Sequence, residues 1–188
     1  MERIMAIYFY GCTTMDGYLA DKNHQLEWLF ETGSPEETNY KDFYQKMDIA
    51  IMGRRTFNSI EGFDNIKTFY PTTINYVFTH DEQFCEEGFI PVQGDIIKFI
   101  QRLDPKKNIW IVGGNTILAP LLDQNLVDVI ILQIAPVLLG NGVPLFTQKD
   151  DLKRFKLQEV HQYGPFAEMV FIKNLDESIN SRQKVQTK

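Results

Sequence analysis

The stretch Asn108-Ile-Trp-Ile-Val-Gly-Gly-Asn-Thr116 decides how the rest of this sequence is interpreted. An apolar run ends here at two adjacent glycines, Gly113 and Gly114, and the helix-like pattern of residues 115–122 begins directly behind them. Glycine allows a close backbone approach, and the N–H groups of a first helical turn have no partners inside the helix. A strand that ends in such a turn therefore predicts an anion site. A Gly-Gly pair is also common in turns that bind nothing, so the motif needs support from elsewhere in the sequence.

A second strand-to-helix junction lies in Asp48-Ile-Ala-Ile-Met-Gly-Arg-Arg-Thr-Phe57. It also ends in a glycine, Gly53, and it adds the guanidinium groups of Arg54 and Arg55. Adjacent arginines after a buried strand are usually solvated surface residues. A helix start, however, is unfavourable for cations, and a bound phosphate would remove that conflict. Because an arginine fork binds phosphate and can select NADP over NAD through the 2′-phosphate, the two junctions together indicate a dinucleotide.

Strand-like and helix-like segments alternate along the chain. We expect strands at residues 4–10, 49–52, 74–79, 89–93, 108–112 and 127–137, helices at 34–47, 56–60, 95–103 and 115–122, a polar loop at 13–23 and a final strand pair at 153–160 and 167–173. This order predicts one α/β domain over residues 1–175, with a largely parallel sheet of about eight strands, flanked by helices and ending in antiparallel strands. Residues 176–188 are expected to form a flexible tail. Ligands of such sheets bind beyond the carboxyl ends of the strands, where both glycine junctions and the Asp16-Gly17 turn fall.

Composition argues against several classes of protein. The 188 residues carry a formal net charge of −6, which disfavours broad attraction to nucleic acid or to a membrane surface. No apolar run reaches the roughly 18 residues of a membrane span, and there is no signal-peptide pattern. Cys12 and Cys85 are expected to be reduced thiols, and the three histidines have no ligand spacing. We therefore predict a cytoplasmic protein without a metal site.

Ser34-Pro35-Glu36-Glu37 has the form of a helix start. The two glutamates have alternative roles there. As caps, they would stabilise the positive end of the helix dipole. Alternatively, one carboxylate would point into the cleft and hold or protonate a heterocycle.

Four segments together carry a family resemblance. They are Thr14-Met-Asp-Gly-Tyr-Leu-Ala20, Met52-Gly-Arg-Arg-Thr-Phe57, Ile109-Trp-Ile-Val-Gly-Gly114 and Ala135-Pro-Val-Leu-Leu-Gly-Asn-Gly-Val-Pro-Leu-Phe146. In this order, the sequence resembles the dihydrofolate-reductase-like superfamily. It is most similar to the C-terminal reductase domain of the bifunctional riboflavin-biosynthesis deaminase/reductase, in a stand-alone form because there is no zinc deaminase half.

The resemblance implies an NADPH-dependent reductase of a small nitrogen heterocycle or its ribityl precursor, and a homodimer. Its motif positions assign Gly53, Arg54, Arg55 and Thr56 to the 2′-phosphate side, Thr79 to the adenosine, and Gly113, Gly114, Asn115 and Thr116 to the pyrophosphate. A loop of Thr14, Met15, Asp16, Gly17 and Tyr18 would cover nicotinamide and substrate. Asp16 and Glu37 are the catalytic candidates, Glu37 because the spacing back from Gly53 places the acid of true dihydrofolate reductases near it.

The chemistry stays open between two reactions. A riboflavin-type reduction delivers hydride to the ribosyl carbon, whereas a folate-type reduction also needs a carboxylate to assist protonation of the ring nitrogen. A hypothesis from another class is a non-catalytic nucleotide-binding or oligomerisation module with the same fold. The apolar residues 127–146 are the candidate dimer surface.

Overall fold

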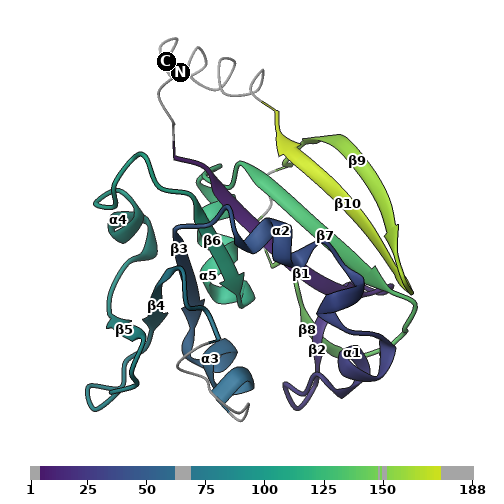
Figure 1. Ribbon diagram of the computed structural model, residues 1–188, viewed down its shortest axis with the longest axis horizontal. Coiled ribbons are helices and arrows are strands. Elements are labelled where there is room, and N and C mark those ends of the chain that lie inside the picture. The colour runs from purple at the N-terminus through teal and green to yellow at the C-terminus, as the bar shows by residue number, and fades with distance from the viewer. Residues whose placement is uncertain (1–4, 62–68, 148, 150–151, 175–188) are drawn as a thin grey trace.

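The computed structural model describes residues 5–61, 69–147, 149 and 152–174 (Figure 1), and the expected tail lies outside them. The strands are β1 (Ile7–Thr14), β2 (Tyr18–Asp21), β3 (Ile49–Gly53), β4 (Ile74–Phe78), β5 (Phe89–Val92), β6 (Ile109–Gly113), β7 (Val129–Ala135), β8 (Gly142–Pro144), β9 (Phe155–Tyr163) and β10 (Phe166–Lys173). The helices are α1 (Glu27–Thr32), the 3₁₀ helix η1 (Pro35–Glu37), α2 (Tyr40–Tyr44), α3 (Arg54–Glu61), α4 (Ile96–Ile100) and α5 (Asn115–Asp123).

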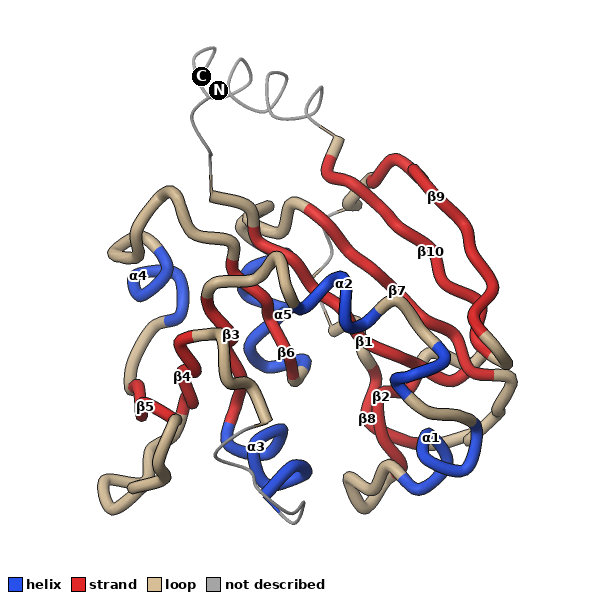
Figure 2. The backbone as a smooth tube through the Cα atoms, viewed as in Figure 1, coloured by secondary structure: helices blue, strands red, loops and turns tan. Residues whose placement is uncertain are grey.

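Eight strands form one sheet in the order β5-β4-β3-β6-β1-β7-β10-β9. The pairs from β5 to β7 are parallel, and β10 runs antiparallel to both β7 and β9. The long β9–β10 pair closes one end of the sheet (Figure 2). The predicted α/β class, with a mostly parallel sheet that ends in antiparallel strands, is confirmed.

Helices cover the sheet on both faces. Ile49 and Ile51 of β3 pack in the core that contains residues of α4 and α5, whereas Ala50 and Met52 pack in the core that contains residues of α2 and α3. Every residue of β3 is buried. Burial on two faces explains why the central strands are continuous apolar runs rather than alternating ones.

The predicted loop over residues 13–23 is wrong at its start and in its middle. Strand β1 continues beyond Gly11 to Thr14, because residues 8–14 pair with β7 along its whole length. Thr13 and Thr14 are buried in this pairing. Residues 18–21 then form β2, which pairs antiparallel with β8 in a separate ribbon. Neither ribbon strand was predicted, and α1 was missed as well.

The predicted helix over residues 34–47 is also wrong, because it is broken into η1 and α2. Thr38 separates the two with an extended backbone. Its hydroxyl donates to the Pro35 carbonyl at 2.8 Å and accepts from the Tyr40 N–H at 3.2 Å. Such local side-chain bonds compete with helical bonds, which explains the break.

Two further features concern the helices. None of the helices in the described part of the chain is long and apolar enough to cross a membrane. Pro120 lies in the second turn of α5 rather than in the first, where it would have been easiest to accommodate.

Candidate functional site

A cleft of about 820 Å³ opens at the carboxyl ends of the central strands. In Figure 1 this is the lower edge of the sheet, where α3 follows β3 and where the β2–β8 ribbon and α1 also lie. Every predicted cofactor residue lines the cleft, namely Gly53, Arg54, Arg55, Thr56, Thr79, Gly113, Gly114, Asn115 and Thr116. The structure therefore brings together residues that lie up to about sixty positions apart in the sequence.

The two glycine junctions touch each other. A Cβ atom on Gly53 would lie 4.0 Å from the backbone nitrogen of Gly114. The Thr56 hydroxyl lies between the junctions, 3.5 Å and 3.6 Å from the Cβ positions of Gly113 and Gly114. Gly113 has a φ of 142°, which favours glycine, and Gly114 is the N-cap of α5. The first N–H groups of α5 thus lie in the wall of the cleft beside the start of α3.

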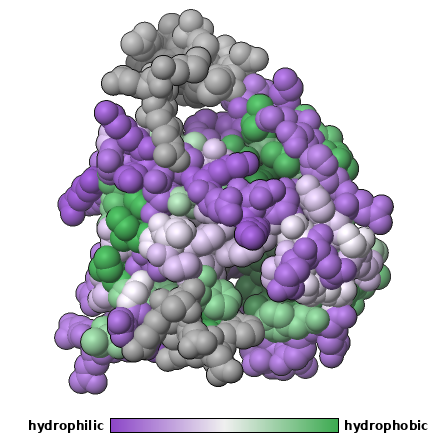
Figure 3. Space-filling model, in the orientation of Figure 1, coloured by the Kyte–Doolittle hydropathy of each residue, from purple (hydrophilic) through white to green (hydrophobic). Residues whose placement is uncertain are grey.

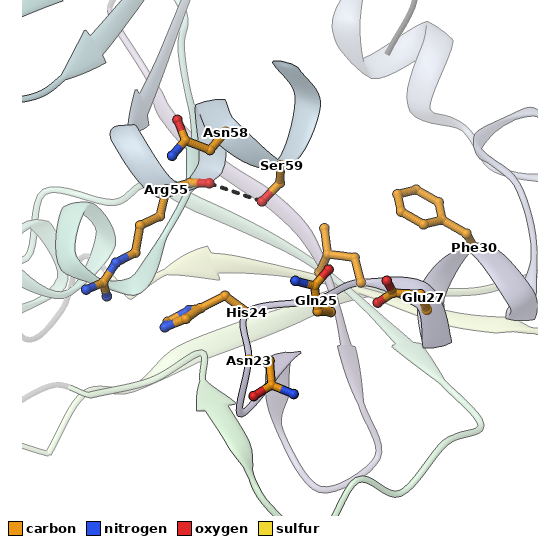
Figure 4. Close-up of a pocket in the computed structure, with 9 residues that line it drawn as sticks. Asn23, His24, Gln25, Glu27, Phe30, Arg55, Asn58 and Ser59 are labelled. Atoms are coloured by element: carbon orange, nitrogen blue, oxygen red, sulfur yellow. Dashed lines mark hydrogen bonds between the residues drawn. The ribbon is translucent and has the colours of Figure 1, made fainter. Parts of the chain in front are cut away.

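Arg54 and Arg55 have different surroundings. The Arg54 guanidinium carbon lies 4.8 Å from the Phe84 ring centre, and its Nη1 lies 3.9 Å from a carboxylate oxygen of Asp81. The backbone N–H of Asp81 donates to the Thr79 hydroxyl at 3.0 Å, so this cluster holds Arg54 near the predicted adenosine residue. Arg55 is exposed, and it lines both the cleft and a second, smaller pocket that shares residues with the cleft (Figure 4).

Aromatic side chains make up much of the remaining wall. Tyr10, Tyr40, Tyr70 and Trp110 line the cleft, and the ring centres of Tyr40 and Trp110 are 5.8 Å apart. Burial raises the pKa values of Tyr10 and Tyr40 well above their usual range. Burial likewise raises the pKa of Cys12 to about 12. This part of the wall is uncharged at neutral pH and suits a planar ring.

The described residues of the cleft wall include neither aspartate nor glutamate. In the described part of the chain, no group of three or more His, Cys, Asp or Glu side chains could hold a metal ion. The cations of the wall are Arg54 and Arg55, with the imidazoles of His24 and His80 beside them. An electron-rich phosphate ligand fits this balance of charge.

The predicted nicotinamide loop does not line the cleft. Thr14, Met15, Asp16, Gly17 and Tyr18 lie outside its wall, and the ribbon contributes Leu19, Ala20 and Val143 instead. The extension of β1 to Thr14 explains this, because it carries the Asp16-Gly17 turn past the cleft edge.

Asp16 connects the β1–β2 turn to residues 139–140 through hydrogen bonds. Its carboxylate accepts hydrogen bonds from the Thr14 hydroxyl at 2.6 Å, from the Gly140 N–H at 2.7 Å and from the Leu139 N–H at 3.1 Å. The hydrogen bond from Thr14, together with those from Gly140 and Leu139, lowers the pKa of Asp16. Asp16 thereby ties the β1–β2 turn to the segment that leads into β8, and its catalytic role stays a prediction.

Glu37 is exposed and is not part of the cleft wall. Its Oε2 atom accepts a hydrogen bond from the Ser34 N–H at 2.9 Å, while Glu36 accepts one from the Ser34 hydroxyl at 2.6 Å. Both contacts fit the capping alternative. They satisfy or orient groups at the start of η1.

We therefore expect Glu37→Gln to leave turnover unchanged and to lower the free energy of unfolding by about 0.3–1 kcal/mol, the usual contribution of a carboxylate at a helix start. Glu36→Gln is the matched control at the neighbouring position. Melting temperature and NADPH oxidation are measured on both variants. A large fall in turnover with normal stability would instead establish Glu37 as the acid.

A buried carboxyl group that was not predicted from the sequence lies behind the cleft wall. Glu168 of β10 is 0% exposed. It accepts hydrogen bonds from Asn39 Nδ2 at 2.9 Å and from Gln133 Nε2 at 3.0 Å. Gln133 Nε2 also donates to the hydroxyl of Tyr10 at 2.8 Å. Burial raises the pKa of Glu168 above its ordinary value.

The alternation of residues along β10 indicates that this glutamate is buried. In Phe166-Ala-Glu-Met-Val170 the alternation puts Glu168 on the same side of the strand as Phe166 and Val170, which are apolar. A charged residue in the inward phase of a strand indicates a buried polar contact.

Known proteins resemble this chain in sequence and fold. The profile of the RibD C-terminal domain family matches residues 67–167. The Bacillus subtilis protein YwjB is 28% identical over 176 residues, which cover 92% of this chain and 99% of YwjB. A solved structure of a protein from Shewanella sp. PV-4 has a TM-score of 0.78 at 24% identity and covers 90% of this chain and 99% of that chain.

Dihydrofolate reductase from Enterococcus faecalis, solved in complex with NADP(H), has a TM-score of 0.62 at 14% identity and covers 90% of this chain and 96% of that chain. The structural matches confirm the predicted dihydrofolate-reductase-like fold. The family profile spans more than half of the sequence. The chain therefore belongs to the RibD C-terminal domain family.

Proposed function

We propose that the chain is an NADPH-dependent reductase that resembles 5-amino-6-(5-phosphoribosylamino)uracil reductase. One observation carries the proposal. Two glycine-ended strands and the helices behind them meet at a single cleft, beside an arginine and an aromatic wall. Neither a purely structural module nor a metal enzyme needs that combination.

The residues present fit the cofactor. A Cβ atom on Gly114 would find only the Thr56 hydroxyl within 4 Å among the described atoms, so the backbone is open to a close approach by pyrophosphate. The start of α5 offers N–H groups to the same anion, and Arg54 offers a guanidinium at the Thr79 end. When bound, NADPH supplies the hydride for the reduction. The Enterococcus faecalis enzyme of the same fold was solved in complex with NADP(H).

The substrate half of the cleft acts by orientation. Tyr40 and Trp110 contribute aromatic surface against which a planar heterocycle can pack, and Leu29 and Pro35 limit the access of water to it. The described wall contains no carboxylate to protonate a ring nitrogen. That favours a riboflavin-type reduction at an imine-like or carbonyl-like carbon over a folate-type reduction, which depends more on such an acid.

The test of the activity is NADPH oxidation with two kinds of substrate, a phosphoribosylaminopyrimidine and a dihydropterin. The proposal predicts oxidation with the first and slow or no oxidation with the second. Tight NADPH binding without turnover on either substrate would favour the alternative, a non-catalytic nucleotide-binding module.

Cofactor selectivity is expected to depend on Arg54. A charge-assisted hydrogen bond to phosphate contributes about 1.5–3 kcal/mol, so wild-type protein should prefer NADPH over NADH by roughly tenfold or more. Arg54→Gln should abolish most of that preference, whereas Arg55→Gln, the matched control, should keep it. Titrations followed by protein fluorescence give the dissociation constants. Equal constants for the two cofactors in the wild-type protein would defeat the assignment.

We also keep the homodimer and the cytoplasmic location as proposals. The apolar residues 127–146 are explained largely by β7, an inner strand between β1 and β10. The better dimer surface is β9, an edge strand on which Leu157 and Val160 are exposed. Hydrophobic surface is visible near β9 and β10 at the upper right of Figure 3. Light scattering with Val160→Lys tests this surface.

A further inference from the structure

A network of four side chains lies behind the cleft wall and connects three strands to the segment between η1 and α2. Its members, which we call the Glu168 network, are Tyr10 of β1, Gln133 of β7, Glu168 of β10 and Asn39. Asn39 Nδ2 and Gln133 Nε2 donate to the two carboxyl oxygens of Glu168, at 2.9 Å and 3.0 Å. Gln133 Nε2 also donates to the Tyr10 hydroxyl at 2.8 Å, and that hydroxyl donates to Asn39 Oδ1 at 3.2 Å. The four side chains therefore form a closed circuit of hydrogen bonds.

The Glu168 network reaches the cleft wall at two tyrosines. Tyr10 belongs to the network and lines the cleft, and Tyr40, which also lines the cleft, directly follows Asn39 in the chain. The ring centres of Tyr10 and Tyr40 are 5.9 Å apart. The Tyr10 ring also stacks on Phe43 of α2, with 4.7 Å between the ring centres, so that α2 lies against β1 (Figure 1). A change in the network would therefore move both tyrosines.

The segment between η1 and α2 depends on side chains for its position. The backbone N–H groups of residues 37 and 38 donate to carbonyls of residues 34 and 35, inside the same segment. Those hydrogen bonds set its local shape but do not attach it to the sheet. The Asn39 side chain attaches it, because it contacts Glu168 through its nitrogen and Tyr10 through its oxygen.

A carboxyl group suits the position of Glu168 for a specific reason. Two amide donors point at it, and a carboxyl group can accept a hydrogen bond on each of its oxygens. A side-chain amide has only one oxygen, so a glutamine at this position would turn its N–H₂ group toward one of the donors. Phe166 and Val170, on the same side of β10, are apolar, so burial at this place does not by itself call for an acid.

We propose that Glu168 is a positioning residue of the substrate site. Its two amide partners hold the rings of Tyr10 and Tyr40 in the part of the wall against which the heterocycle packs. The proposal rests on the reductase function proposed above and adds a residue that acts without touching the ligand. The cofactor junctions belong to β3, β6, α3 and α5, outside the network. Glu168 should therefore affect the binding of the substrate and not that of NADPH, because misplaced orienting groups act on the ligand that they orient.

The test exchanges the carboxyl and amide groups within the Glu168 network. Glu168→Gln removes one acceptor, and Asn39→Asp removes one donor and places two carboxyl groups side by side. In the double variant all four hydrogen bonds can form again. The amide now on β10 accepts from Gln133 and donates to the new carboxylate at position 39, which also accepts from the Tyr10 hydroxyl. Glu159→Gln on the exposed strand β9 is the matched control.

Two measurements are made on the wild-type protein and on every variant. Hydrogen–deuterium exchange without ligand reports the amides of residues 38–44, and calorimetry gives the affinity of the NADP⁺-saturated protein for a phosphoribosylaminopyrimidine. Each single variant should speed exchange at residues 38–44 and weaken pyrimidine binding, both by about tenfold, the factor that one lost hydrogen bond can supply. Exchange at residues 53–56 and 113–116 and the affinity for NADPH should stay at the wild-type values. The double variant should recover both losses, and Glu159→Gln should cause neither.

Several results would overturn the proposal. They are wild-type exchange at residues 38–44 in Glu168→Gln, wild-type pyrimidine affinity in that variant, an equal loss of NADPH affinity, or a double variant no better than the single ones. Should Glu168→Gln not fold, Tyr10→Phe gives the same comparison, because it keeps the ring and removes one hydroxyl from the network. Failure of the reductase proposal is distinguishable, because the wild-type protein would then not bind NADPH, whereas the exchange rates of residues 38–44 test the network without any ligand.

Discussion

Gly114→Val is expected to weaken NADPH binding by more than about a hundredfold in a protein that still folds, because at least two charge-assisted bonds of about 1.5–3 kcal/mol each are lost. The backbone of Gly114 has a φ of −88°, which valine adopts without strain. Its Cβ atom would meet the Thr56 hydroxyl at 3.6 Å, an ordinary contact. The branched side chain would, however, keep pyrophosphate away from the backbone N–H groups at the start of α5.

Gly114→Ala is the matched control for this substitution. It adds only the Cβ atom, so it should fold equally well and lose less affinity than the valine variant. Circular dichroism and a melting curve establish folding, and calorimetric titration gives the dissociation constant. Normal NADPH binding by the valine variant would place the anion site elsewhere. Unfolding of both variants would make the glycine a packing residue.

Glu168→Ala is expected to lower the free energy of unfolding by about 2–4 kcal/mol, since it creates a cavity and removes the acceptor of two amide donors. Those donors belong to Asn39 and Gln133. Glu168→Gln keeps the shape and most of the hydrogen bonding, so its loss should be smaller. Glu159→Ala on the exposed strand β9 is the control, with an expected change within about 1 kcal/mol. Urea unfolding measures all three, and equal losses for Glu168 and Glu159 would contradict the account.

The raised pKa of Glu168 also fixes the sign of a pH effect. The folded protein holds the carboxyl proton more tightly than the unfolded chain, for which the ordinary value is 4.5. The stabilising contribution is therefore complete below pH 4.5 and is lost as pH rises through the folded pKa. Tyr10 and Cys12 of β1 and His161 and Tyr163 of β9 face the same region, so the comparison is wild type against Glu168→Gln, which leaves them in place.

The contribution of Asp16 to stability depends on pH in the opposite direction. Its pKa is lowered from 3.8 by the hydrogen bonds from Thr14, Gly140 and Leu139, so its contribution is present above pH 3.8 and is lost as pH falls below it. The effects of Asp16 and Glu168 thus fall in separate pH windows.

The meeting of the two glycine junctions in one cleft could be predicted from sequence because its signals are local. A buried strand, a glycine and a helix start follow one another within about ten residues at both junctions. Parallel pairing then brings the carboxyl ends of β3 and β6 side by side. Local patterns and the global fold agree at these positions.

The arrangement of the β1–β2 turn, of residues 34–44 and of Glu168 could not be predicted, because distant contacts decide it. Thr14 belongs to a strand only through its pairing with Ala135. Asp16 finds its partners at residues 139 and 140, more than 120 positions away. The break at Thr38 depends on one hydroxyl group, and Glu168 depends on amides from two other elements. No local pattern carries these contacts.

Hydrogen–deuterium exchange of the wild-type protein, with and without NADPH, tests the central claim most directly, because it reports binding and location together. We predict that NADPH protects the backbone amides of residues 53–56 and 113–116, the two junctions that meet in the cleft. Protection should be weaker with NADH. An exchange pattern that NADPH leaves unchanged, or protection confined to other segments, would contradict the account.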